Sequence, residues 1–109
     1  MIFHIATFTW NDTAKARDIE ELEAALRLDV ENFPAVTLYA CGSDLGIRLG
    51  SEGFAIVAGA ASAEELTGYL DDEGHKAIAS KWKDFIATKH SVEFESDVFI
   101  DSSDNSFQK

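Results

Sequence analysis

The chain has 109 residues, a formal net charge of −11 at pH 7 and 46% hydrophobic residues. This length fits one domain, and the composition is typical of a globular protein and not of a disordered one. A surface this acidic repels a phosphate backbone and an anionic membrane surface, so we expect neither nucleic acid nor a membrane as a partner.

Residues 2–10, IFHIATFTW, predict the first strand because β-branched and aromatic residues dominate and two faces alternate. Both faces are mostly apolar, which indicates a sheet that is covered on both sides. The segment has no cationic start and no long apolar run, so it does not read as a signal peptide. With Cys41 as the single cysteine, no intramolecular disulfide is possible. We expect a cytoplasmic protein.

Turn residues at 11–13 precede a helix predicted over 14–28 by its apolar spacing. Strands are predicted at 35–41 and 54–60, on either side of a loop at 42–53 with four glycines. Ser62 and Glu65 form a capping box that opens a short helix. Residues 71–74 interrupt this helix, a second helical segment runs over 75–87, and the last strand is predicted at 89–95.

The predicted order is βαββαβ with the second helix broken, which is the ferredoxin-like α+β arrangement. It places helices on one face of a four-stranded antiparallel sheet and leaves the apolar opposite face bare, so we expect a second copy to cover it. Residues 1–95 then form the single domain, and 96–109 form an acidic and polar tail. Within the tail, DVFI at 97–100 could add a short edge strand or lie on a partner.

The segments HIATFTW at 4–10, GSDLG at 42–46, EGFAIVAGA at 52–60 and YLDDEGHKAIASKW at 69–82 follow one another at a particular spacing. In order and spacing the chain resembles the stress-responsive dimeric α/β-barrel (Dabb) family. The resemblance covers about residues 1–95 and implies a homodimer in which two sheets form a barrel ringed by helices. Related families on this scaffold include cofactor-free monooxygenases, muconolactone isomerase-like enzymes and a plant polyketide cyclase.

The resemblance also implies candidate site residues. Cyclase-like members carry a Y-x-x-H-P-x-H pattern, in which Tyr69 matches the tyrosine and His75 the last histidine. Asp72 and Glu73 replace the first histidine and the proline. His4 matches a histidine that lines the pocket of those members. Their further pocket histidine on the third strand is absent, because Ile56 or its neighbour at position 55 stands there, and this counts against a plant-like cyclase.

The chemistry of the pair can be stated from the residue types. A histidine accepts a proton near neutral pH, and a tyrosine donates a hydrogen bond to a carbonyl or an enolate oxygen. His75 and Tyr69 are therefore candidate catalytic residues, with His4 fixing orientation. The structural alternative is that Tyr69 belongs to the core, that His75 serves a helix corner and that His4 is a hydrogen-bonded core histidine.

Three functions remain open from the sequence. The first is a homodimer that binds a small, largely apolar molecule in a pocket lined by His4, Tyr69 and His75. The second is a cofactor-free enzyme, either a polyketide cyclase-like lyase or a monooxygenase-like protein, and the third is a dimer with no ligand. No metal site is expected, because no zinc spacing occurs and the acids at 71–73 read as a solvated turn.

The remaining reactive or large side chains are interpreted as structural. Cys41 has no identifiable activating base, so we expect an unreactive thiol. His90, beside a lysine on the last strand, is expected at the surface. Trp10 and Trp82 are expected in the core or at the interface between copies.

Overall fold

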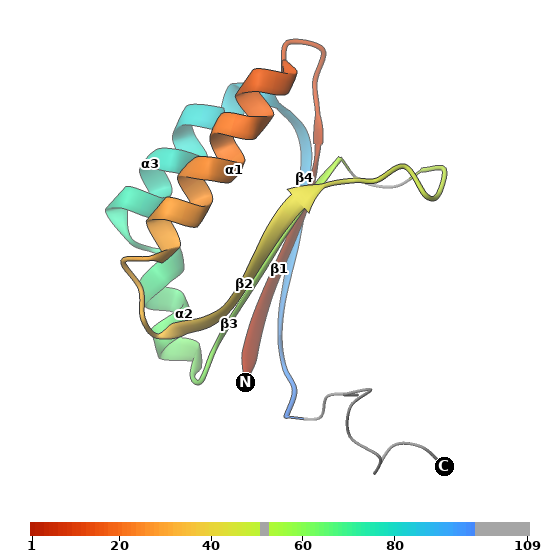
Figure 1. Cartoon of the computed structure of the whole chain (residues 1–109). Helices are drawn as coiled ribbons and strands as arrows, with labels where there is room; N and C mark the ends of the chain where they lie inside the picture. Colours follow the sequence, from red (N-terminus) through yellow and green to blue (C-terminus); the bar gives the residue numbers. More distant parts are fainter. Residues whose placement is uncertain (51–52, 98–109) are drawn as a thin grey trace, which may run out of the picture.

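The computed structural model describes residues 1–50 and 53–97. A four-stranded antiparallel sheet has the strand order β2-β3-β1-β4, with three α-helices in the described part of the chain (Figure 1). This is the predicted ferredoxin-like α+β fold with a broken second helix. The elements in chain order are β1 (Ile2–Trp10), α1 (Ala16–Val30), β2 (Val36–Ser43), β3 (Phe54–Ala60), α2 (Ala63–Leu70), α3 (Glu73–Trp82), a 3-10 turn (Lys83–Phe85) and β4 (Ile86–Glu95).

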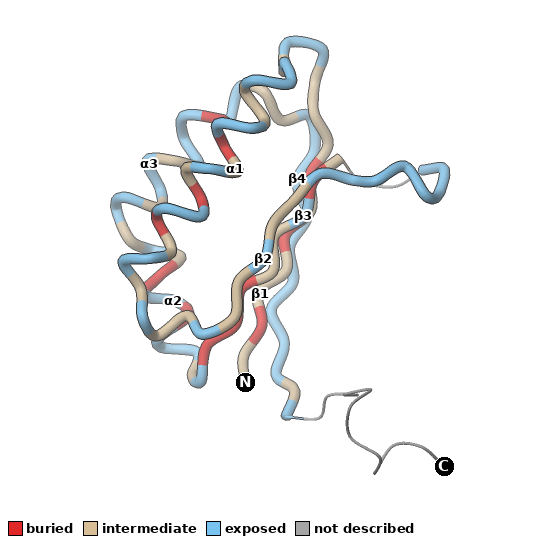
Figure 2. Tube along the Cα trace, viewed as in Figure 1, coloured by how far each residue is buried: buried red, intermediate tan, exposed pale blue. Residues whose placement is uncertain are grey.

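The helices cover one face of the sheet, and the buried residues concentrate between these two layers (Figures 1 and 2). One buried cluster, around Phe8, Phe54 and Trp82, fills the space beneath α1 and α3. A second cluster, around Ala58, Leu66 and Tyr69, lies beneath α2. The core therefore consists of two clusters along the sheet. Tyr69 lies near the C-terminal end of α2, just before α3 begins.

Side-chain caps fix the break between α2 and α3. Ser62 Oγ accepts a hydrogen bond from the Glu65 amide at 3.2 Å and begins α2, as the sequence indicates. Asp72 Oδ2 accepts from the amides of Gly74, at 2.8 Å, and His75, at 3.3 Å, and so begins α3. Asp72 thus places His75 in the first turn of a new helix.

Several predicted boundaries differ from those observed, among them the first helix end, at Val30 and not at 28, and the start of the last strand, at Ile86 and not at 89. The first helix begins at Ala16 and not at 14, because the Asn11 side chain accepts from the Thr13 amide and Asp18 caps the Lys15 amide. The helical segment predicted over 75–87 ends at Trp82, and residues 86 and 87 belong to β4. Trp82 Nε1 donates to the Asp18 carbonyl at 2.8 Å, which fastens the end of α3 to the start of α1. The second strand runs on to Ser43, so the predicted loop begins later.

The face of the sheet turned away from the helices carries exposed apolar side chains. Val92 and Phe94 on β4 are 53% and 43% exposed, although Phe94 stacks on Phe3 at a ring-centroid distance of 5.2 Å. They share one face of β4 because they are two residues apart on a strand. An apolar sheet face of this kind is typical of a surface that meets a partner.

Part of the predicted tail lies outside the described residues, including positions 98–100 of DVFI. Within the described ranges, no helix is long and apolar enough to cross a membrane. The same part of the chain contains no group of three or more histidine, cysteine, aspartate or glutamate side chains that could hold a metal ion.

Candidate functional site

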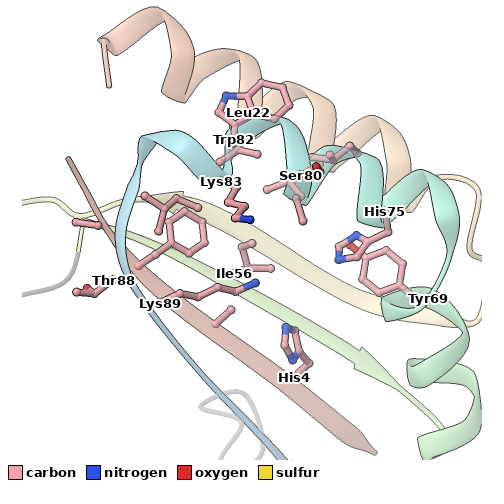
Figure 3. A pocket seen from close by; sticks show the side chains of 17 residues that line it. His4, Leu22, Ile56, Tyr69, His75, Ser80, Trp82, Lys83, Thr88 and Lys89 are labelled. Atoms are coloured by element: carbon pink, nitrogen blue, oxygen red, sulfur yellow. The ribbon is translucent and has the colours of Figure 1, made fainter. Parts of the chain in front are cut away.

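A cavity of about 510 Å³ lies between the helices and the sheet (Figure 3). Its wall is mainly apolar, with contributions from Phe8, Leu22, Ile56 and Trp82. The polar members of the wall are His4, Tyr69, His75, Ser80, Lys83, Thr88 and Lys89. An apolar hollow with a few polar groups is the usual form of a small-molecule site.

The residues that line the cavity follow the periodicity of the strand or helix on which they lie. His4, Ala6 and Phe8 line it from β1, because alternate residues of a strand share a face. His75, Ile78, Ala79 and Trp82 line it from α3, at the spacing of one helix face. Of the two third-strand positions considered for a pocket histidine, Ile56 lines the cavity and Ala55 does not.

All three residues singled out in the sequence, His4, Tyr69 and His75, line this one cavity. The rings of Tyr69 and His75 have their centroids 4.5 Å apart and tilt by 48° (Figure 3). Tyr69 is 1% exposed and also packs edge-on against Phe33 and Tyr39. Its ring therefore belongs both to the core and to the cavity wall.

A buried carboxylate stands behind His75. Nδ1 of His75 lies 3.4 Å from Oδ2 of Asp29, near the C-terminal end of α1, and Asp29 is 9% exposed. Burial lowers the pKa of His75, and the Asp29 charge opposes this, while Lys89 and His4 lower the pKa further. The imidazole is therefore neutral near pH 7. Since Nδ1 faces Asp29, Nε2 is the ring nitrogen left for a ligand.

Asp29, Tyr39, Tyr69 and His75 form one buried polar cluster. Among the described residues, five buried side-chain polar atoms have no hydrogen-bond partner, and four of them belong to these residues. Burial raises the pKa of Tyr69 to about 12 and that of Tyr39 well above its usual range, so both hydroxyls keep their protons. A buried polar atom without a partner costs stability, so such a concentration points to a functional site.

A contact with the neighbouring strand β4 holds the His4 side chain in place. It pairs with Glu93 across β1 and β4, and His4 Nδ1 lies 2.7 Å from Glu93 Oε2. The His4 side chain is largely buried and that of Glu93 is half exposed. The contact fixes the His4 ring at the cavity wall.

Sequence reasoning missed Asp29, Tyr39, Glu93, Lys83 and Lys89. Asp29 carried a usable signal, because it follows Leu22 and Leu26 on the buried face of α1. An acid near the C-terminal end of a helix is also disfavoured by the helix dipole, which suggests that its charge has another partner. The two lysines carried no comparable signal, since their approach to the cavity depends on how β4 packs beside α3.

Of the residues interpreted as structural, Trp82 belongs to the core and also lines the cavity, whereas Trp10, Cys41 and His90 do not line it. Cys41 packs against the core on β2, and burial raises the pKa of its thiol, which makes the thiol a poor nucleophile. His90 is exposed on β4. Asp71 and Glu73 are exposed at the helix break, where Asp72 serves as the cap.

The structure is similar to several solved ones. A dimeric ferredoxin-like protein of unknown function from Thermobifida fusca is 33% identical, with a TM-score of 0.80 over 85% of this chain and 88% of that one. A Dabb family protein with a ferredoxin-like fold from Mesorhizobium loti is 14% identical, with a TM-score of 0.71 over 87% and 95%. A hydroxynitrile lyase from Passiflora edulis is 13% identical, with a TM-score of 0.76 over 91% and 96%. At such low sequence identities, the similarity to the last two proteins shows a shared fold and nothing more. The sequence matches no family model and no curated protein.

Proposed function

Because the chain belongs to the family of dimeric ferredoxin-like proteins, we propose that it binds a small, largely apolar molecule between its helices and its sheet. The observation that carries the proposal is the cavity of about 510 Å³, which has the size of known small-molecule sites. His4, Tyr69 and His75 supply polar groups that orient the ligand. Nε2 of His75 accepts a hydrogen bond from it, since the one proton of the neutral ring lies on Nδ1, which faces the Asp29 carboxylate.

In this proposal the working unit is a homodimer. The related Thermobifida fusca protein is described as dimeric. Two copies meet through the face of the sheet that carries Val92 and Phe94, which lies opposite the helices and the cavity. The dimer leaves the mouth of each cavity open, because interface and cavity use opposite faces of the sheet.

Thermal-shift measurements on a panel of small aromatic and aliphatic molecules test ligand binding. A ligand that binds only the folded chain raises the melting temperature, by an amount that grows with its concentration. Ala79→Trp, on the cavity wall, is expected to fill the site and abolish the shift. Ala77→Trp is the matched control, because Ala77 is exposed on the same helix and does not line the cavity. Equal shifts for both variants would place binding elsewhere.

A second candidate function is acid–base catalysis without a cofactor. The observation that favours it is a neutral histidine with a buried carboxylate at Nδ1 and a protonated tyrosine beside it. In this role Nε2 of His75 takes a proton from an acidic O–H or C–H group of the substrate. The Tyr69 hydroxyl donates a hydrogen bond to the substrate oxygen on which negative charge develops.

Two substrate classes test the catalytic role. Aromatic cyanohydrins are chosen because a protein of this fold is a hydroxynitrile lyase, and linear poly-β-ketones test intramolecular condensation. His75→Gln is expected to lower any turnover by about 100-fold or more, as loss of a general base does. His90→Gln is the control, since His90 lies outside the cavity. Turnover that His75→Gln leaves unchanged would exclude His75 as the base.

A further inference from the structure

The charged residues of the cavity wall are basic, whereas the chain as a whole is acidic. The sequence has 20 acidic and 9 basic residues, yet none of the described residues that line the cavity is acidic. The wall instead includes two lysines, Lys83 and Lys89, and two histidines. The cavity therefore differs from the protein as a whole, whose net charge of −11 repels anions.

The two lysines reach the cavity from both layers of the fold. Lys83 lies in the 3-10 turn after α3, and Lys89 lies on β4. In Figure 3 both side chains point into the space between the helix and the sheet, with their amino groups on either side of Ile56. The positive charge of Lys89 also contributes to the lowered pKa of His75, so its field extends across the cavity.

Neither lysine is neutralised by an acid in the described part of the chain. No ion pair there includes Lys83 or Lys89. Two acids that reach residues of the wall, Glu93 and Asp29, contact His4 and His75 instead. Two ammonium groups without protein partners, next to an apolar wall, can both donate to the same anion.

We propose that the ligand is an anion, an apolar molecule that carries a carboxylate. The carboxylate lies between the amino groups of Lys83 and Lys89, and the apolar body packs against Trp82, Ile56 and Phe8. This inference rests on the proposed binding function, because it assigns the head group of the same ligand. Both lysines are exposed side chains, so a carboxylate held between them stays partly hydrated, and the apolar wall strengthens the charge-assisted hydrogen bonds only in part.

Three probes of one shape test the head group by isothermal titration calorimetry. They are 2-naphthoate, the neutral 2-naphthamide and the cationic 2-naphthylmethylammonium. We expect 2-naphthoate to bind about tenfold more tightly than 2-naphthamide at low salt, the usual effect of a hydrogen bond to a charged group. 2-Naphthylmethylammonium is expected to bind most weakly.

Paired variants assign the preference to the two lysines. In Lys83→Met/Lys89→Met, 2-naphthoate and 2-naphthamide are expected to bind within about twofold of each other, with the amide affinity unchanged. Lys76→Met is the control, because Lys76 is exposed on α3 and does not line the cavity. It removes a positive charge and is expected to keep the tenfold preference.

The outcomes separate this inference from the function on which it rests. Equal affinities of the three probes for the unsubstituted protein would overturn the anionic ligand and leave the apolar binding site standing. In that case the aliphatic parts of Lys83 and Lys89 only cover apolar surface at the mouth of the cavity. Failure of all three probes and of the wider thermal-shift panel to bind would overturn both proposals.

Discussion

Nδ1 of His75, in the first turn of α3, lies 3.4 Å from Oδ2 of Asp29, near the C-terminal end of α1. Both atoms are buried, and neither has a hydrogen-bond partner in the described part of the chain. The contact joins two helices beside the cavity and determines which nitrogen of His75 faces it. A carboxylate in this position orients the imidazole, which is how a histidine is prepared to bind or to accept a proton.

Asp29→Asn keeps the shape of the side chain and removes its charge. Because the Asp29 charge opposes the effect of burial, we expect the pKa of His75 to fall further below its usual value. Titration of the imidazole signals by NMR measures the change. Glu23→Gln, on the same helix and paired with Arg27, removes one negative charge away from His75 and serves as the control. A His75 pKa that is the same in Asp29→Asn and in the unsubstituted protein would show that the two side chains do not interact.

The lowered pKa of His75 makes the free energy of unfolding depend on pH. The unfolded chain binds this proton more readily, since the ordinary value is 6.5. The contribution of His75 is therefore complete above about pH 6.5 and is lost as the pH falls through the folded-state pKa. We expect urea unfolding of His75→Gln to show a shallower decline in stability than the unsubstituted protein as the pH falls below about 6.5. An equally steep decline in both proteins would contradict the assignment.

The order of strands and helices was predictable because local signals agree with the fold. Alternating apolar residues at 2–10 and 54–60 match β1 and β3 in their observed bounds. The end of α3 was misplaced by several residues, because Ile86 continues the apolar spacing of the helix. What ends the helix is tertiary: Trp82 bonds to the Asp18 carbonyl, and β4 pairs with β1 from Ile86 onward.

The candidate site was predictable only in part. Tyr69, His75 and His4 stood out as residue types, and the positions of α2 and α3 over the sheet bring them to one cavity. The roles of Asp29 and Lys89 depend on distances between elements that no local pattern specifies. From the sequence, Lys89 is expected to be a solvated surface residue. It lines a cavity only because the helices lie over the same face of the sheet.

Tyr69→Phe tests whether the buried hydroxyl is kept for a purpose other than stability. The hydroxyl forms no well-aligned hydrogen bond with a described residue and interacts only with the Tyr39 hydroxyl, so its removal costs little. We expect the free energy of unfolding to stay level or to rise by up to about 1 kcal/mol. Tyr69→Ala, which also removes the ring, is expected to cost about 3 kcal/mol or more. Urea unfolding measures both, and a marked loss of stability in Tyr69→Phe would reveal a hydroxyl contact that holds the fold.

Phe94→Lys tests the surface through which two copies are proposed to meet. Phe94 is 43% exposed on the sheet face opposite the helices, so a lysine there is tolerated in a single chain but places two buried charges in a dimer. We expect the dimer dissociation constant to rise about 100-fold or more, as for a central interface residue, with sedimentation equilibrium as the measurement. Leu28→Lys is the matched control, because Leu28 is 68% exposed on α1, on the helical side of the molecule. If Phe94→Lys remains as dimeric as Leu28→Lys, the sheet face is not the interface; if the unsubstituted chain is a monomer at micromolar concentration, the homodimer itself is wrong.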